Sequence, residues 1–126
     1  MTTTSSTKMT IKEIASRFNE LAQAEKWFEI QDEFFSDDVK SIDPEGSAYF
    51  GYAEGKEAVR KKGMDFVAEI TAVHSAYTSE PVIAGDHFAV AREIEITHNA
   101  YGRIAMKEIM LYAVKDGKII LEQFIY

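Results

Sequence analysis

Residues 87–115 read HFAVAREIEITHNAYGRIAMKEIMLYAVK, and apolar and polar side chains alternate on both sides of a turn-forming centre. Alternation with a period of two residues predicts antiparallel strands over 87–98 and 103–115, joined by a three-residue loop. That register places Arg92 opposite Glu108 on an otherwise apolar face. A lone charge is costly there, so we expect the two side chains to form an ion pair. The pair either neutralises itself at the edge of a core or contacts a ligand.

The segments before and after this hairpin complete the predicted fold. Apolar residues at helical spacing predict three helices, which begin near residues 10, 27 and 56. Period-two patterns predict further strands near 39–43, 73–83 and 118–126. The second helix is expected to end at the turn-forming residues 36–38, SDD. Helices followed by an antiparallel meander are typical of the α+β class.

Composition limits the classes of function. The 126 residues suit one domain, with 46% hydrophobic and 28% charged residues, and the net charge of −7 opposes a nucleic-acid partner. The absence of cysteine excludes disulfides and thiol chemistry and is compatible with the cytoplasm. The polar first eight residues lack a signal peptide's apolar core, and no apolar run reaches the roughly 18 residues of a membrane span. We therefore expect a disordered tail over 1–8, one domain over 9–126, and a cytoplasmic protein without a membrane partner.

The predicted strand over 103–115 is apolar on both of its faces. Its outward face carries Ala105, Ile109, Leu111 and Ala113. An antiparallel sheet with one solvated face would instead alternate between apolar and polar residues. We therefore expect a homodimer through the outer face of the sheet. Coverage of this face by the tail or by a loop is the alternative.

Three motifs occur in an order and spacing that resemble those of a known superfamily. They are FFSDDVKSIDPEGS at 34–47, GKEAV at 55–59 and LYAVKDGKIILEQFIY at 111–126. Over roughly residues 9–126 the chain resembles the nuclear transport factor 2-like superfamily, and within it the SnoaL-like proteins and the ketosteroid isomerases. The resemblance implies a cone in which a curved antiparallel sheet wraps three N-terminal helices and leaves an apolar pocket. It also implies a homodimer.

The same resemblance implies a general base without oxyanion donors. In ketosteroid isomerases the base is the Asp of an Asp-Pro at the end of the first strand, which corresponds to Asp43 here. The donor positions correspond to Phe18 and Met110, whose side chains cannot donate a hydrogen bond. One lost donor lowers a rate by about 10²–10³, so ketosteroid isomerase activity itself is not expected. Asp43 could equally begin a DPEG turn and accept backbone hydrogen bonds.

Further acid–base candidates lie on the predicted meander. SnoaL-like cyclases use residues of the meander, which implies Glu108 and Glu122 as candidates. Glu122 shares a face with Glu108 if the turn at 115–117 has three residues, whereas a two-residue turn would place Gln123 there. His74 opens a predicted strand and either exchanges a proton near neutral pH or is structural.

The pocket is expected to bind a small apolar or amphipathic molecule. Its candidate contacts are Phe18, Trp27, Tyr52, Arg92, Met110, Tyr112 and Glu122. Tyr52 belongs to an aromatic, glycine-rich segment that either covers the pocket mouth or packs on the core. His98 lies beside a predicted turn and is expected to be solvated. The sequence has no metal-ligand spacing, GxGxxG or P-loop, so we expect no metal and no cofactor.

Three functions are compatible with these residues. In the first, Asp43 is the base of a cofactor-independent isomerase or cyclase that transfers a proton on a small apolar carbonyl compound, assisted by Arg92, Glu108 and His74. In the second, the same pocket belongs to a non-catalytic binding protein. In the third, the fold is an assembly module and its dimer surface is its function. The Asp-Pro at the strand end favours the enzyme.

Overall fold

The computed structural model describes residues 8–126, which form three helices and seven strands. In chain order these are α1 (Ile11–Gln23), α2 (Trp27–Phe34), β1 (Phe35–Ile42), β2 (Ala53–Glu54), α3 (Lys56–Ala68), β3 (Ile70–Thr78), β4 (Val82–Ala84), β5 (His87–His98), β6 (Gly102–Lys115) and β7 (Lys118–Ile125). The predicted tail lies outside the described residues except for Lys8, whose ammonium is 3.6 Å from the Asp116 carboxylate. Between residues 8 and 126, none of the helices combines the length and the apolar character that a membrane span requires.

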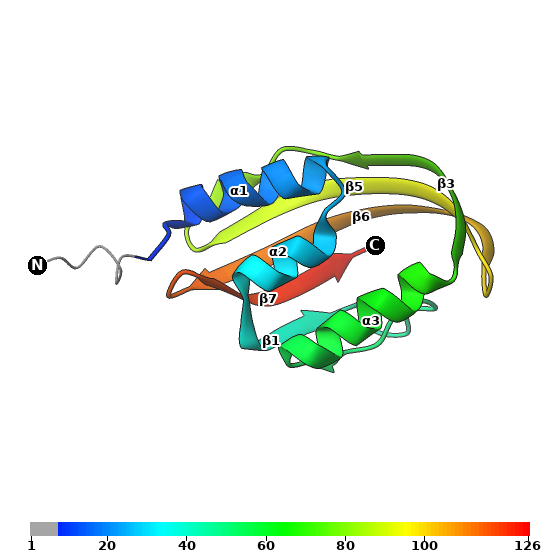
Figure 1. Ribbon diagram of the computed structural model, residues 1–126, viewed down its shortest axis with the longest axis horizontal. Helices are drawn as coiled ribbons and strands as arrows, with labels where there is room; N and C mark the ends of the chain where they lie inside the picture. Colours follow the sequence, from blue (N-terminus) through cyan, green and yellow to red (C-terminus); the bar gives the residue numbers. More distant parts are fainter. Residues whose placement is uncertain (1–7) are drawn as a thin grey trace, which may run out of the picture.

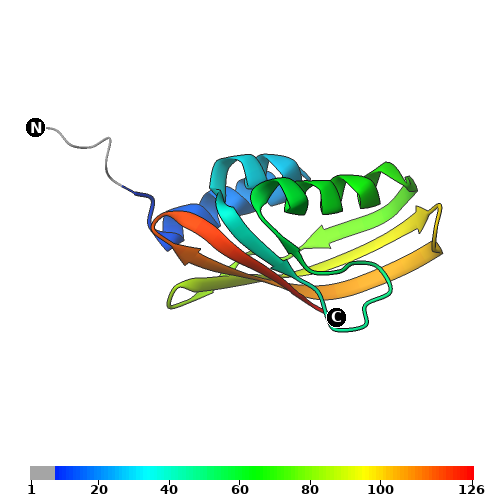
Figure 2. The same ribbon diagram turned by 90° about the horizontal axis from the view of Figure 1, so that it is seen from below.

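The strands form one curved sheet, and the three helices lie on its concave face (Figure 1, Figure 2). The strand order is β2-β1-β7-β6-β5-β3, with β4 also paired to β5. The α+β class is confirmed, but the sheet is mixed and not purely antiparallel as predicted, because β1 pairs with β7 in parallel. β7 pairs antiparallel with β6 along one edge and parallel with β1 along the other edge.

The hairpin of β5 and β6 has the predicted register. Arg92 pairs with Glu108, and His98 pairs with Gly102, so three residues form the loop between the strands. Side chains at paired positions share a face, which places the Arg92 and Glu108 side chains on the concave, helix-bearing face. This hairpin therefore fixes which side chains can face the helices.

The turn between β6 and β7 has two residues, Asp116 and Gly117, and both have positive φ angles of 52° and 76°. With this turn alone, Gln123 would face the helices. An extra residue in β7, Ile120, shifts the register so that Tyr112 pairs with Glu122. Of the two alternatives for this turn, the two-residue turn is the one that forms, and a β-bulge brings Glu122, not Gln123, to the concave face.

Strand β1 begins earlier than predicted, at Phe35. Residues 36–38 lie within the strand and do not end the preceding helix as a turn. Phe35 pairs with Ile119 of β7, and both side chains are buried. Strand pairing and the burial of an aromatic ring therefore override the local turn preference of SDD.

The predicted strand over 73–83 is two strands, β3 and β4, which both pair with β5. Pro81 lies between them and has no N–H group to contribute to a ladder. Ser79 joins this break to β5, because its N–H donates to the Ala91 carbonyl and its hydroxyl accepts from the Ala91 N–H, both at 2.8 Å. Register shifts in β3 accompany the curvature of the sheet.

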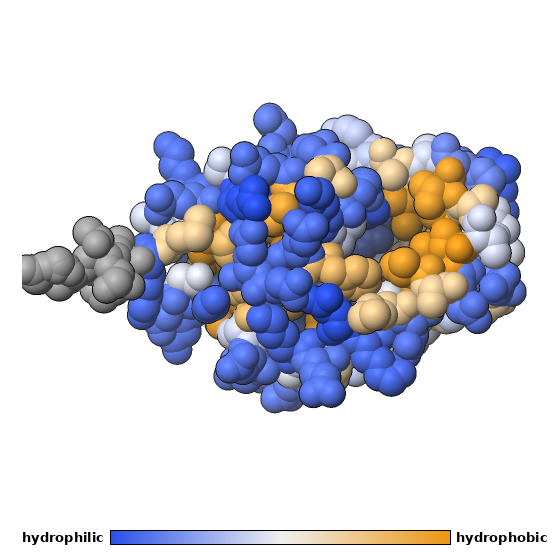
Figure 3. Space-filling model, in the orientation of Figure 1, coloured by the Kyte–Doolittle hydropathy of each residue, from blue (hydrophilic) through white to orange (hydrophobic). Residues whose placement is uncertain are grey.

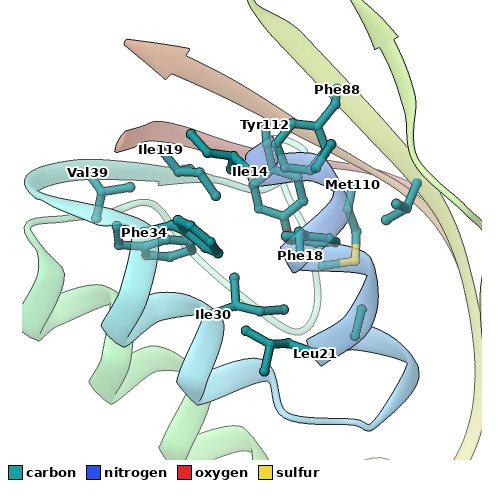
Figure 4. Close-up of a cluster of buried hydrophobic side chains, with 14 of the residues drawn as sticks. Ile14, Phe18, Leu21, Ile30, Phe34, Val39, Phe88, Met110, Tyr112 and Ile119 are labelled. Atoms are coloured by element: carbon teal, nitrogen blue, oxygen red, sulfur yellow. The ribbon is translucent and has the colours of Figure 1, made fainter. Parts of the chain in front are cut away.

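The core lies between α1, α2 and the concave face of the sheet (Figure 4). The Phe18 ring contacts Phe88 and Tyr112, with ring centroids 5.0 and 4.8 Å away. A capping box of Thr10 and Glu13 begins α1, so its first N–H groups have partners. The aromatic cluster anchors α1 to the sheet.

Candidate functional site

A cavity of about 330 Å³ lies between α2, α3 and the concave face of the sheet. Its walls are mainly apolar and include Trp27, Phe50, Phe66, Met106, Met110 and Phe124. Figure 3 shows a hollow on the helix-bearing face, beside which apolar side chains gather. Small-molecule sites in proteins have this size and combine an apolar wall with a few polar groups. The polar side chains that reach the cavity therefore decide what it can do.

Glu108 reaches the cavity from β6. Burial raises the pKa of Glu108 to about 7; attraction by Arg92 lowers it, and repulsion from Asp43 and Glu122 raises it. No hydrogen bond from the described residues contributes to this balance. A carboxyl group that titrates near neutral pH and has no protein partner can exchange a proton with a ligand.

Glu122 lines the cavity from β7 and is buried. Its two carboxyl oxygens accept hydrogen bonds from the Ser41 hydroxyl at 2.8 Å and the Tyr112 hydroxyl at 3.4 Å. Burial raises the pKa of Glu122 to about 7, whereas the Ser41 hydrogen bond and the Lys62 charge lower it. Glu122 thus titrates in the same range as Glu108 but is held by protein groups.

Asp43 follows β1, and only 1% of its side chain is exposed. One carboxylate oxygen accepts from the Lys62 ammonium, and the other accepts from the Tyr126 hydroxyl at 2.8 Å. Lys62 also donates to the Ser41 hydroxyl at 2.9 Å, which connects this group to Glu122. Asp43 is not among the residues that line the cavity, whereas Lys62 is. Both oxygens of Asp43 are therefore engaged by side chains, and neither accepts the backbone hydrogen bonds of a DPEG turn.

The predicted ion pair between Arg92 and Glu108 does not form. Arg92 instead pairs with Glu25 at 3.0 Å and donates to the Thr78 hydroxyl at 2.9 Å. Its guanidinium lies over Trp27, 4.5 Å from the ring centroid, and the Trp27 indole N–H donates to the same Glu25 carboxylate at 3.1 Å. Glu25 reaches Arg92 from a left-handed turn between α1 and α2, where its φ is 57°. These contacts engage Arg92 at one side of the cavity and leave Glu108 without a hydrogen-bond partner in the part of the chain that the structure describes.

Besides Asp43, three predicted site residues are not among those that line the cavity. His74 is exposed, and its Nε2 lies 2.8 Å from the Thr97 hydroxyl. Tyr52 is 59% exposed, and its hydroxyl donates to Glu54 at 2.8 Å. Phe18 is fully buried within the core cluster. In this arrangement none of the three contacts a ligand in the cavity.

His98 was expected to be solvated, and that prediction is wrong. Its side chain is buried, Nε2 donates to the Phe66 carbonyl at 3.1 Å, and Nδ1 accepts from the Ala100 N–H at 3.1 Å. The ring packs against Phe66 and Tyr101, with centroids 4.6 and 4.9 Å away. The loop between β5 and β6 therefore packs against the end of α3 and covers the imidazole.

Sequence reasoning missed Lys62 and Gln31, which both line the cavity. Lys62 belongs to a basic run that suggests a solvated face, yet it follows Val59 by three residues and precedes Phe66 by four. Gln31 follows Phe28 by three residues. Residues at these spacings share a helical face. The signal for both residues was therefore a polar side chain at a position where the helical spacing predicts an apolar one.

A curved sheet that wraps three helices around a cavity is the architecture of the nuclear transport factor 2-like proteins. The model of one family within this class, described as the SnoaL-like domain, matches residues 9–126. The chain therefore belongs to the SnoaL-like domain family. No curated protein matches it in sequence.

Solved structures agree with this assignment. A Mesorhizobium loti protein, provisionally named a SnoaL-like polyketide cyclase, is 34% identical, and the match covers 94% of this chain and 100% of that chain with a TM-score of 0.87. A nuclear transport factor 2-like protein from Burkholderia thailandensis is 12% identical, over 93% of this chain and 90% of that chain, with a TM-score of 0.76. A protein with a ketosteroid isomerase-like fold from Catenulispora acidiphila, in complex with trimethylamine, is 20% identical, over 77% and 72% of the two chains, with a TM-score of 0.59. The last two comparisons show the fold alone.

Proposed function

We propose that this protein is a cofactor-independent isomerase or cyclase that transfers a proton on a small, mostly apolar carbonyl compound. One observation carries the proposal. Glu108 reaches an apolar cavity of about 330 Å³ without a hydrogen-bond partner among the described residues, and burial raises its pKa to about 7. A general base is most effective when its pKa lies near the working pH, because it is then ionised yet still basic.

In the proposed reaction the Glu108 carboxylate removes a proton from the carbon beside the carbonyl group. The electron pair of that C–H bond passes into an enolate. In an isomerase the Glu108 carboxyl group returns the proton to another carbon of the same compound. In a cyclase the enolate carbon forms a bond to a second carbonyl carbon, and the oxygen of that carbonyl takes the proton. In both reactions, atoms and electrons balance without a cofactor.

The remaining polar groups have supporting roles in this proposal. The Lys62 ammonium brings a positive charge to the cavity wall, and Asp43 and Ser41 hold it there. A fixed positive charge stabilises the developing enolate oxygen in a water-poor site. Asp43, expected to be the base, acts here as a positioning residue for Lys62 because both of its oxygens are engaged. The 34% identity with a protein provisionally named a polyketide cyclase supports the cyclase form of the reaction.

The test uses 5-nitrobenzisoxazole, whose elimination requires only a base that removes a proton from carbon and releases a coloured phenolate. We expect the wild type to accelerate this elimination, with kcat/KM rising with pH and levelling above about 7. Glu108→Gln should lower kcat/KM by about 10²-fold or more, because general-base catalysis contributes that much. The exposed Glu80→Gln is the matched control and should react like the wild type. Equal rates for Glu108→Gln and the wild type would refute the assignment.

A non-catalytic binding protein is the second candidate. The observation that favours it is the absence of a hydrogen-bond donor at Phe18, which is fully buried, and at Met110, which lines the cavity. A binding protein would be stabilised by apolar carbonyl compounds through mass action and would turn none of them over. In that case Glu108→Gln would leave the elimination of 5-nitrobenzisoxazole unchanged while altering ligand affinity.

We also propose that a second copy of this chain covers the outer face of the sheet. Within residues 8–126, no helix lies on that face (Figure 2). Tyr77, Ile109 and Ile125 have exposed fractions of 56%, 42% and 51% there, and Ile109 pairs directly with Ile125. Exposed apolar side chains gathered on one face of a sheet mark interaction surfaces. A homodimer would bury them against their own copies.

A further inference from the structure

The carboxamide of Gln31 is a polar group in the apolar wall of the cavity. Gln31 lies on α2, lines the cavity, and is only 8% exposed. It follows Trp27 by four residues and Phe28 by three, so it occupies the helical face that both aromatic rings present to the cavity. An apolar side chain would suit this position by packing alone.

The Gln31 carboxamide has an unmet hydrogen bond. Among the described residues, its Oε1 is the one buried side-chain oxygen or nitrogen that has no partner. More than nine-tenths of buried polar groups in proteins are paired, because an unpaired one has lost its hydration without replacement. An exception on the wall of a cavity is explained if a bound molecule supplies the missing donor.

The neighbouring helix leaves space beside this amide. Gly63 of α3 lines the same cavity, and a Cβ atom placed on it would lie 3.2 Å from the Phe28 ring and 3.9 Å from the Gln31 Nε2. A glycine within a helix is unfavourable relative to alanine. At this position it allows the amide and the Phe28 ring to border the cavity without a methyl group between the two helices.

We propose that Gln31 is the polar contact for the ligand and that the ligand carries a hydroxyl or enol group which donates to its Oε1. This inference rests on the proposed function for the nature of the ligand, since the enol form of a carbonyl compound supplies such a donor. The Nε2 of the same amide can donate to an adjacent carbonyl oxygen. The preferred ligand class is therefore a mostly apolar ring compound with a hydroxyl or enol group, and a plain hydrocarbon of the same shape is disfavoured.

The test compares 2-naphthol with 2-methylnaphthalene, in which a methyl group replaces the hydroxyl at nearly the same size. Dissociation constants are measured by equilibrium dialysis at pH 6, where 2-naphthol is neutral, for the wild type and for Gln31→Met. We expect the preference for 2-naphthol, expressed as the ratio of the two constants, to fall by about 2- to 10-fold in Gln31→Met, the range of one net hydrogen bond. Gln31→Met should also melt at a higher temperature than the wild type, because it removes an unpaired buried oxygen.

The control is Phe28→Leu, which reshapes the same wall without changing a polar group and should weaken both ligands alike. Gln31→Leu repeats the measurement in case Gln31→Met does not fold. An unchanged ratio in the Gln31 variants, or failure of 2-naphthol to bind the wild type at millimolar concentration, overturns the inference. A lower melting temperature of both Gln31 variants also overturns it, since the amide would then have a partner in the folded chain.

Failure of this inference differs from failure of the proposed function. Dialysis requires no turnover, so the ratio of the two dissociation constants does not depend on whether Glu108 removes a proton from a substrate. Loss of the preference only in the Gln31 variants, together with no elimination of 5-nitrobenzisoxazole by the wild type, supports Gln31 and refutes the enzyme. Elimination that depends on Glu108, with an unchanged ligand ratio in Gln31→Met, supports the enzyme and refutes Gln31.

Discussion

Glu122→Gln should stabilise the protein in a pH-dependent manner. Burial raises the pKa of Glu122 from 4.5 to about 7. Below pH 4.5 the carboxyl is protonated in both the folded and the unfolded chain, so its stabilising contribution is fully present there. Between pH 4.5 and about 7 the unfolded chain has lost the proton that the folded chain still holds, so the free energy of unfolding falls as the pH rises. Above about 7 the folded chain has lost the proton as well, and the stabilising contribution is gone. The difference between the two pKa values corresponds to about 3 kcal/mol when the loss is complete.

Between pH 5.5 and pH 8 the wild type should therefore lose about 2 kcal/mol more unfolding free energy than Glu122→Gln does. Urea unfolding measures this difference, with the fluorescence of Trp27, the single tryptophan, as the signal. With a slope of about 1–3 kcal/mol per molar urea, the midpoints at pH 8 should differ by roughly 1–3 M. Glu80→Gln controls for the lost surface charge. A constant difference between Glu122→Gln and the wild type across this pH range would refute the raised pKa.

Two further variants test the surroundings of the cavity. Asp43→Asn should lower the free energy of unfolding at pH 7 by about 3 kcal/mol, because it leaves the partly buried Lys62 ammonium without its counter-charge; a stability equal to that of the wild type in urea unfolding would contradict the ion pair. Ile109→Glu should convert a dimer to a folded monomer in sedimentation velocity, whereas Lys107→Glu on the same face should not; a wild-type monomer would exclude the proposed dimer.

The sequence predicted best those elements that local pattern and pairing specify together. The β5–β6 hairpin is long, and β5 has a clearly apolar and a clearly polar face, so a one-residue slip would expose that apolar face; the register therefore follows from the sequence. Strand β1 was less predictable, because the turn preference of residues 36–38 is local whereas its pairing partner, β7, lies at the far end of the chain. The bulge at Ile120 has no local signal of its own.

The acidic residues of the candidate site were predicted from the sequence, whereas the ion pairs around them were not. Glu108 was recognisable as a charge that breaks an apolar strand face. The partner of Arg92 was not recognisable, because Arg92 has both a cross-strand neighbour, Glu108, and a tertiary neighbour, Glu25, and only the folded chain shows that Glu25 forms the ion pair. Lys62 escaped notice because it ends a basic run, a pattern typical of a solvated face, although its own position lies on the apolar face of α3.

The arrangement of charges assigns different tasks to the acids. Lys62 is paired with Asp43, so its charge is not available in full to Glu122, and repulsion from Asp43 raises the pKa of both remaining acids. Glu122 has hydroxyl donors on both oxygens, which hold it in place, whereas Glu108 has none from residues 8–126. Glu108 is therefore free to approach a ligand. Burial that raises the pKa of a carboxyl group to about 7 lowers the stability of the folded chain once the group is ionised. Proteins retain such a cost chiefly where function requires it.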